Sequence, residues 1–284
     1  MKQVAPLRYD VIFKKAFGQP DIFTALVKDF TGIELEIDEV ENDKTFYPAV
    51  ANVANRFDLF AEDKKNRVIV EMQHAHYPDT YERFLYYQLS AMVESIKSAS
   101  NYKFPKTVIT MVFFTEKKTP SPDSALLFHK FNEMEDFKGN KFNLFGREHQ
   151  MLFIYTSSYG HADLPEEIEE WMKAIDNSLT GTIYEEDYTN PKIQRIFELI
   201  EMDNLTPEEN ARLKDDYYPE KSLREAAQAR AEIEQVKAEA QVEIAKAKAK
   251  AKAEAALNLK ALGTLTDEQI ANAIGLTLEE VKAL

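Results

Sequence analysis

The spacing of apolar residues along the chain first predicts helices. Residues 10–30 carry apolar side chains at helical intervals, and Gly32 follows them as a helix-stopping residue. The same spacing returns over residues 79–99 and over residues 164–177, where Pro165 stands at the start. We therefore expect an amphipathic helix in each of these segments.

Strand-like patterns fill the segments between these helices. Residues 33–40 alternate apolar and acidic positions, which is typical of a half-buried strand. Residues 52–63 and 67–73 predict two more strands, joined as a hairpin by the polar loop between them. Continuous apolar runs at 107–115 and 150–158 predict buried strands that are covered on both faces. The order α-β-β-β-α-β, followed by a further strand and helices, indicates a mixed α/β fold.

The pattern changes near residue 219. Aromatic residues are dense up to Tyr218 and absent afterwards, and we place a domain boundary at Pro219. Residues 222–262 are strong helix formers with no Gly or Pro, which predicts a helix of about 60 Å. Its apolar positions, mostly Ala, fit an eleven-residue repeat better than a heptad, so a coiled coil here is weak or right-handed. We favour a solvated stalk or oligomerisation arm over a basic helix that binds nucleic acid.

The end of the chain predicts two short helices. Thr266 and Thr277 each begin a capping box, and Gly275 stands between the two helices as a C-cap. This arrangement resembles a helix-turn-helix. Because Glu279 and Glu280 would face the phosphates of DNA, we favour a small interaction module over a DNA-binding motif. We therefore predict three parts: a core at residues 1–218, a long helix at 219–262 and a helix-turn-helix-like module at 263–284.

Composition and charge exclude several classes of protein. The 284 residues include no Cys, which excludes disulfide scaffolds, Cys-based zinc sites and thiol catalysis. No apolar run approaches the roughly 20 residues of a membrane helix, and the N-terminus lacks the apolar segment of a signal peptide. We therefore expect a cytoplasmic protein with no membrane partner. The formal net charge is −14, and the first 216 residues hold 25 basic and 38 acidic residues, which argues against a uniformly basic nucleic-acid-coating surface.

Candidate chemistry lies in the predicted hairpin. If Glu62 stands opposite Arg67, the same register places Asp58 opposite Glu71, with their Cβ atoms roughly 5 Å apart. Two carboxylates that close repel each other, and a hard divalent cation is the natural partner for them. Such a site could also use the backbone carbonyl of Met72.

Glu71 and Gln73 lie two residues apart on one strand and therefore point to the same face. Gln73 could position a water or a phosphate oxygen, whereas a glutamine cannot act as a base. The alternative reading is that these are ordinary charged residues on the solvent face of a hairpin. The apolar residues on either side of Asp58 and Glu71 favour a functional role, because a carboxylate inside an apolar strand is costly unless it has a partner.

Several segments resemble a known family. The motifs RFDLFAEDKKNRVIVEMQ and YERFLYYQLS, the opening RYDVIFKKAFG and the later NLTPEENARLKDD are similar to the PD-(D/E)XK nuclease family transposases. These are also known as the Rpn family of recombination-promoting nucleases and transposases. The Ala/Lys-rich helix ending in GLTLEEVKAL resembles the family's common tail. The resemblance is strongest over residues 8–115.

The resemblance implies a restriction-endonuclease-like core, with a central mixed sheet flanked by helices, and cleavage of DNA that depends on Mg²⁺, with Mn²⁺ as a substitute. Asp58 and Glu71 would match the acidic residues of the family's motif, and Gln73 stands where the motif usually has Lys. Asp10 would match an acidic position of the first helix and support the metal site, or it is a helix N-terminal acid favoured by the macrodipole. Arg83 could contact a phosphate, or it is a solvated or ion-paired surface residue.

Two hypotheses about function follow. The first is a metal-dependent DNA endonuclease linked to recombination, transposition or phage defence, in which a metal-activated water attacks a phosphodiester. The second is a catalytically degenerate protein of the same fold that acts as an oligomeric interaction or assembly module. The absence of Lys at position 73 keeps the second hypothesis open. In both we expect a homo-oligomer, formed through the core, the C-terminal helix or both.

Overall fold

The computed structural model describes residues 1–47, 54–74, 80–96, 103–115, 124–143, 146–160 and 163–284. Backbone alone is described at residues 80, 216–236, 238, 239 and 245. The contacts within the chain divide it into two units, Met1–Asp216 and Tyr217–Leu284. Among the described residues, we find no helix with the length and apolar character that crossing a membrane requires.

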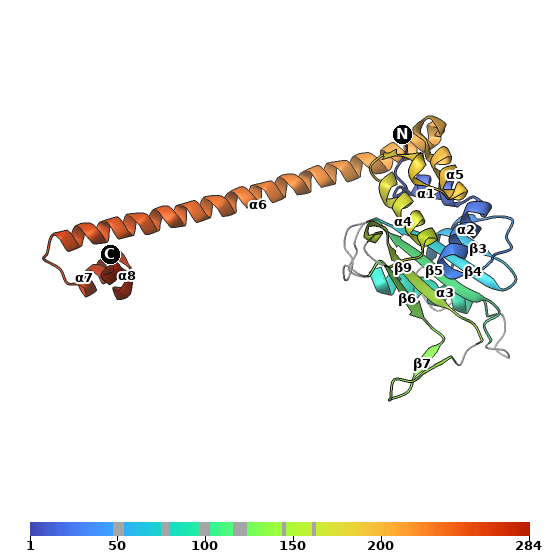
Figure 1. Ribbon diagram of the computed structural model, residues 1–284, viewed down its shortest axis with the longest axis horizontal. Helices are drawn as coiled ribbons and strands as arrows, with labels where there is room; N and C mark the ends of the chain where they lie inside the picture. Colours follow the sequence, from blue (N-terminus) through green and yellow to red (C-terminus); the bar gives the residue numbers. More distant parts are fainter. Residues whose placement is uncertain (48–53, 75–79, 97–102, 116–123, 144–145, 161–162) are drawn as a thin grey trace. The chain divides into compact units, whose positions relative to one another are not determined.

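A six-stranded mixed sheet forms the centre of the first unit (Figure 1), in the order β2-β3-β4-β5-β9-β6. Strands β2, β3 and β4 are antiparallel neighbours, β4, β5 and β9 run parallel, and β6 is antiparallel to β9. The strands are β2 (Glu41–Phe46), β3 (Asn55–Glu62), β4 (Asn66–Gln73), β5 (Thr107–Phe114), β6 (Leu126–Lys130) and β9 (Gln150–Tyr155). Seven of the eight residues of β5 are buried, as its continuous apolar run predicts.

Helices cover both faces of this sheet. On one face they are α1 (Asp10–Phe17), α2 (Pro20–Thr31), α4 (Glu166–Ser178) and α5 (Pro191–Ile200), whose apolar side chains form one core with Val68, Val70 and Met111. On the other face is α3 (Thr80–Glu94), which packs on Ile69, Val108 and Val112. The mixed α/β fold class with helices flanking a central sheet is therefore confirmed.

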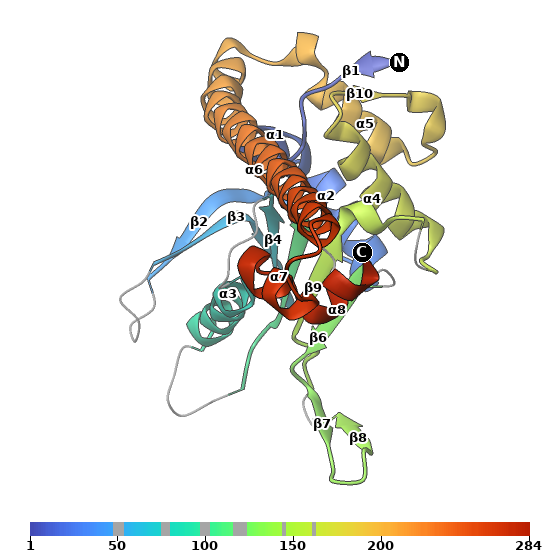
Figure 2. The same ribbon diagram turned by 90° about the vertical axis from the view of Figure 1, so that its left-hand side faces the viewer.

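Two small antiparallel pairs complete the first unit. Strand β1 (Lys2–Gln3) pairs with β10 (Thr182–Ile183), which ties the N-terminus to the segment after α4. Strand β7 (Glu133–Glu135) pairs with β8 (Lys141–Asn143) in a hairpin that projects away from the sheet (Figure 2). Short 3₁₀ turns lie at Thr156–Ser158, Glu185–Asp187 and Met202–Asn204.

The helix predicted over residues 10–30 is two helices. Gly18 ends α1 by donating its N–H to the carbonyl of Lys14 at 2.9 Å. Pro20, which has no N–H to contribute to a continuing helix, then occupies the first turn of α2. Gly32 ends α2 in the left-handed conformation with φ 71°, as predicted for a helix stop. The helix predicted over 79–99 is α3, and residues 79 and 97–99 lie outside the described part of the chain.

The strand predicted over residues 33–40 is wrong. This segment forms an irregular connection, and the strand begins after it, at Glu41. Leu35 is buried, and Ile33, Ile37 and Val40 pack against the main core. The alternation therefore comes from an irregular segment in which Ile33, Leu35 and Ile37 face the core. No neighbouring strand in the described part of the chain pairs with this segment.

The hairpin register is as predicted. Glu62 pairs with Arg67, and the ladder continues through Ala61, Phe60 and Leu59 to Val70. Both strands of the hairpin are present, although residues 52 and 53 of the predicted first strand lie outside the described residues.

The long helix α6 (Pro207–Ala261) begins earlier than predicted and continues through Pro219. Its start is a capping arrangement, in which Glu209 N–H donates to Thr206 Oγ1 at 3.2 Å and Thr206 N–H donates to a Glu209 carboxylate oxygen at 2.8 Å. The assignment of residues 219–262 as an oligomerisation arm stays a prediction.

The end of the second unit is a small helical cluster. Helices α7 (Asp267–Ile274) and α8 (Leu278–Ala283) both begin with the predicted capping boxes. Ala256 of α6 packs with Ile270 and Val281. Lys252 donates to the carbonyl of Gly275 at 2.8 Å, so the last helices fold back on the end of α6. Whether this module binds protein or DNA stays a prediction.

Candidate metal centre

The candidate site lies where the central sheet loses its regular pairing. The β3–β4 ladder stops at Leu59 and Val70, one row before Asp58 and Glu71. The β2–β3 ladder skips the same row, since Asn42 pairs with Leu59 and Lys44 pairs with Phe57. Asp58 therefore stands at an interruption on both sides of its strand.

Side-chain alternation along β3 also slips at this point. Phe57 and Phe60 lie in one cluster, with ring centroids 6.3 Å apart, although regular alternation would place them on opposite faces. Asp43, in the skipped row of β2, has a φ of 57°, which is uncommon for a residue other than glycine. Such irregularities re-aim side chains and are over-represented beside active sites.

Side chains replace the missing ladder bonds. The backbone N–H of Asp58 donates to Glu71 Oε1 at 3.1 Å, and the backbone N–H of Met72 donates to Asp58 Oδ2 at 3.1 Å. Because the N–H and C=O of one strand residue point to the same side, the Met72 carbonyl also faces β3. The predicted pair and the predicted carbonyl are thus brought together at the interruption.

Burial makes both carboxylates costly to ionise. Burial, together with the nearby charges of Asp10 and Asp43, raises the pKa of Asp58 to about 6, and the hydrogen bond from the Met72 N–H opposes part of this rise. Burial and the charge of Asp58 hold the pKa of Glu71 well above its usual range. The charge of Lys14 lowers the pKa of both groups, although it does not offset their burial.

Lys14 is at the centre of an ion-pair cluster that the sequence did not single out. Its Nζ lies 2.6 Å from Asp10 and 2.5 Å from Asp43, and the side chain is 10% exposed. Arg56 lies 2.7 Å from the same Asp43 oxygen that Lys14 contacts. Asp10 is therefore bound to a lysine beside Asp58, and its charge acts on Asp58 through space.

Gln73 and Arg83 also meet. The guanidinium of Arg83, on α3, donates to Gln73 Oε1 at the end of β4, and it lies 4.6 Å from the centre of the Phe84 ring. The charge of Arg83 lowers the pKa of Glu71. The cation that the sequence lacks at position 73 is thus supplied to the edge of the site by a neighbouring helix.

The donor set suits a hard divalent cation. Asp58 and Glu71 each use one oxygen for a backbone N–H, and no donor in the described part of the chain lies within hydrogen-bond distance of their other oxygens. Carboxylate oxygens are the ligands that Mg²⁺ and Mn²⁺ prefer, and a bound cation would offset the burial that disfavours the ionised carboxylates. Among the described residues, no three His, Asp or Glu side chains gather as a complete ligand set. Backbone carbonyl and water would therefore have to complete the coordination.

Comparison with known proteins assigns the chain to a family. The model of a family described as PD-(D/E)XK nuclease family transposase matches residues 7–232. The chain belongs to this family. No curated protein and no solved structure matches the chain. Membership of the PD-(D/E)XK nuclease family transposases supports a nuclease-type function, and it implies DNA as the substrate. The resemblance described from the sequence motifs is confirmed.

One sequence signal could have found the cluster that was missed. Asp10 and Lys14 are four residues apart on one helix, which is the spacing of a helical ion pair. Asp43 and Arg56 carry no such local signal, because they meet only after β2 and β3 pair. Within this member of the PD-(D/E)XK nuclease family transposases, the surroundings of the site are therefore mostly a product of the tertiary fold.

Proposed function

We propose that the protein is a Mg²⁺-dependent DNA endonuclease in which Asp58 and Glu71 hold the metal. The observation that carries the proposal is the carboxylate pair at the interrupted ladder, with Glu71 buried and Asp58 partly buried, in a chain of a nuclease family. When bound, the ion would activate a water for attack on a phosphodiester and stabilise charge on the phosphate. Mn²⁺ would substitute for Mg²⁺.

The other predicted residues act around this pair. The Met72 carbonyl would supply a further oxygen to the metal. Gln73 orients the attacking water or a phosphate oxygen, and its own orientation is set by Arg83. Asp10 supports the site through Lys14, to which it is bound.

The family description, which names transposases, supports a role for this cleavage in DNA transposition or recombination. A role in phage defence and a location in the cytoplasm stay predictions. We also propose a homo-oligomer through α6, because Val242 and Ile244 are 52% and 54% exposed on this helix. Two or more copies on one DNA would raise a weak affinity through effective concentration.

The test is nicking of supercoiled plasmid with Mg²⁺, with Mn²⁺ and with EDTA. We expect cleavage by the native protein with either metal, and at least a hundredfold slower cleavage by Asp58→Asn and by Glu71→Gln. Asp63→Asn is the matched control, because it makes the same chemical change in the turn of the same hairpin. It should leave the cleavage rate unchanged.

Nicking that persists in both variants would refute the assignment of the site. If the native protein cleaves neither plasmid nor single-stranded DNA with either metal, the endonuclease proposal fails. A clean multimer on a sizing column, together with that failure, would favour the second hypothesis of a catalytically degenerate assembly module. Asp58→Asn and Glu71→Gln would then assemble like the native protein.

A further inference from the structure

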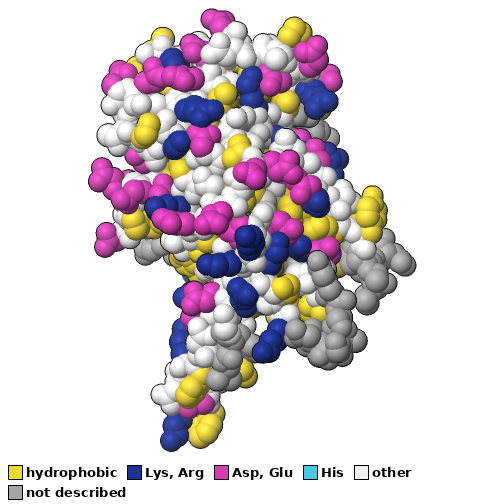
Figure 3. Space-filling view, turned by 90° about the vertical axis from the view of Figure 1, so that its right-hand side faces the viewer, with side chains coloured by type: hydrophobic (Ala, Val, Ile, Leu, Met, Phe, Trp, Pro, Cys, Tyr) yellow, Lys and Arg dark blue, Asp and Glu magenta, His cyan; other side chains and the backbone are white. Residues whose placement is uncertain are grey.

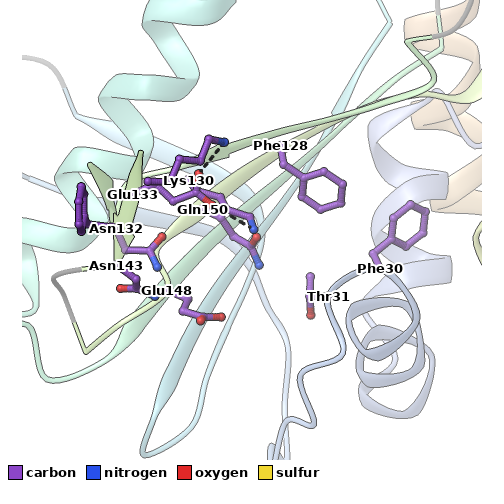
Figure 4. Close-up of a pocket in the computed structure, with 11 residues that line it drawn as sticks. Phe30, Thr31, Phe128, Lys130, Asn132, Glu133, Asn143, Glu148 and Gln150 are labelled. Atoms are coloured by element: carbon purple, nitrogen blue, oxygen red, sulfur yellow. Dashed lines mark hydrogen bonds and ion pairs between the residues drawn. The ribbon is translucent and has the colours of Figure 1, made fainter. Parts of the chain in front are cut away.

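One cavity of the first unit does not include the carboxylate pair. It has a volume of about 470 Å³ and is bounded by the end of α2, the edge strand β6, the β7–β8 hairpin and the start of β9 (Figure 4). Asp58, Glu71 and the residues around them are not among its lining residues. The residues that define its chemistry are Phe128, Lys130, Asn132, Lys141, Phe142 and Gln150.

Asn132 places a buried hydrogen-bond acceptor at the wall of the cavity. The residue is only 4% exposed, and its Oδ1 has no hydrogen-bond partner among the residues that the structure describes. Figure 4 shows its amide directed into the space between the strands. A buried acceptor without a donor is rare in folded proteins, and it marks a position where a ligand can supply the missing N–H or O–H.

Two aromatic side chains stand open at the walls of the cavity. Phe128 on β6 is 49% exposed, and Phe142 on β8 is 47% exposed. Exposed aromatic faces beside amide groups such as that of Gln150 suit a flat ring that stacks and also offers polar edges.

Two lysines add positive charge to the same wall. Lys130 and Lys141 lie 3.4 Å and 3.3 Å from the two oxygens of Glu133, so one carboxylate holds both ammonium groups in place. This trio keeps one net positive charge beside a second carboxylate, Glu148, and its two ammonium groups can bind a phosphate. Glu148 also lines the cavity and offers a second acceptor, which suits an exocyclic amine of a base.

We propose that this cavity binds one nucleotide unit. The base stacks on one of the two aromatic faces, Phe128 or Phe142, donates an exocyclic amine to Asn132 Oδ1, and places its phosphate beside Lys130 and Lys141. A free nucleotide and one nucleotide of a single strand share this chemistry. The proposal does not depend on cleavage at the carboxylate pair.

The test is calorimetric titration of the full chain carrying Asp58→Asn, so that bound nucleic acid is not cut by the proposed activity. The probes are dGMP, dTMP, deoxyribose 5-phosphate and a single-stranded DNA of five guanine-containing nucleotides. We expect dGMP to bind several-fold tighter than dTMP, which lacks an exocyclic amine, and the sugar phosphate to bind more weakly than either. A pentanucleotide at least tenfold tighter than dGMP identifies the strand as the source, and equal affinities identify the free nucleotide.

Variants separate this cavity from other surfaces. Asn132→Ala and Phe128→Ala should each weaken dGMP binding about tenfold or more, because loss of one stacking side chain alone costs roughly fivefold to a hundredfold. The matched controls are Phe137→Ala and Lys138→Ala in the turn of the same hairpin, which do not line the cavity. Phe137 is 94% exposed, and we expect both controls to bind dGMP like the parent. Phe142→Ala, at a half-exposed position, replaces Asn132→Ala if that variant does not fold by circular dichroism.

Several results would overturn the proposal. They are no binding of any nucleotide probe at millimolar concentration, equal binding of dGMP and the sugar phosphate, and dGMP binding that the cavity variants leave unchanged. Binding of an arginine-containing tripeptide in place of every nucleotide would show that the cavity takes a basic peptide. Because all of these titrations use the Asp58→Asn chain, failure of the endonuclease proposal leaves their interpretation intact.

Discussion

Replacing Asp58 with asparagine should make the protein more stable at neutral pH. The carboxyl is partly buried beside Glu71, and its charge is a cost to the folded state. The asparagine amide oxygen can still accept the hydrogen bond that the Met72 N–H donates to Asp58 at 3.1 Å. The change therefore removes a buried charge while it keeps the shape and the main contact of the side chain.

The size of the effect follows from the pKa. The usual pKa of the aspartate carboxyl is 3.8, and burial raises the pKa of Asp58 to about 6. Between these values the folded state binds more protons than the unfolded state, so stability falls as pH rises. Above pH 6 the penalty is complete, and at about 1.4 kcal/mol per unit it amounts to about 3 kcal/mol. Asp58→Asn should remove this penalty above pH 6 and change little below pH 4.

Urea unfolding at a series of pH values measures the difference. Trp171 is the single tryptophan of the chain, is fully buried, and donates to Asp29 at 2.7 Å, so its fluorescence reports on the first unit. Mg²⁺ at a hundred times its dissociation constant should stabilise the native protein by about 2.7 kcal/mol and Asp58→Asn far less.

Asp63→Asn provides a control of opposite sign. Burial raises the pKa of Asp63, but hydrogen bonds from the N–H groups of Lys65 and Asn66 outweigh this effect, and the pKa is lowered overall. This variant should therefore be less stable than the native protein at neutral pH and approach it as pH falls. The reasoning is refuted if Asp58→Asn is no more stable than the native protein at pH 7.5, or if its advantage persists unchanged at pH 4.

Three further predictions follow from the same contacts. Lys14→Met should raise the pKa of Asp58 and so move the acid limb of the pH profile of metal-dependent nicking to higher pH. The control is Lys15→Met, which should leave this acid limb in place because Lys15 pairs with Glu209. Arg67→Met should lower the free energy of unfolding by about 3 kcal/mol in urea, because the buried guanidinium binds two carboxylates and a carbonyl. DNA affinity in a filter-binding assay should fall steeply with salt and with EDTA; tight binding without metal at physiological salt would contradict this.

The elements that the sequence predicted well are those with strong local signals. The β3–β4 hairpin and its register follow from a short polar turn between apolar runs, and the terminal capping boxes follow from Thr266 and Thr277. The break between α1 and α2 and the early start of α6 were also readable, from Pro20 and from the capping arrangement that Thr206 begins. These two boundaries were predicted wrongly because the prediction relied on hydrophobic periodicity and did not use the turn and capping residues.

Other features depend on contacts that no local pattern carries. The alternation of residues 33–40 predicted a strand, yet a strand requires a neighbour, and this segment meets the helical core instead. The pairing of Asp58 with Glu71 was predicted as a regular cross-strand pair. The structure joins them through backbone N–H groups, because the β3–β4 ladder stops before that row and the β2–β3 ladder skips it. Asp43 takes its left-handed conformation in the row that the β2–β3 ladder skips, and this row exists only once the two strands have paired.

The charge of the first unit limits how the proposed site can hold DNA. Acidic and basic side chains intermingle on the face shown in Figure 3. A pocket of about 460 Å³ beside the carboxylate pair is lined by Lys14, Lys15, Arg56 and Arg212. The first three are already bound to Asp10, Asp43 or Glu209, which line the same pocket. A phosphate must therefore compete with carboxylates for these cations. Because a bound divalent ion would neutralise Asp58 and Glu71, metal binding should precede tight contact with DNA, and the affinity for DNA should be set by the metal.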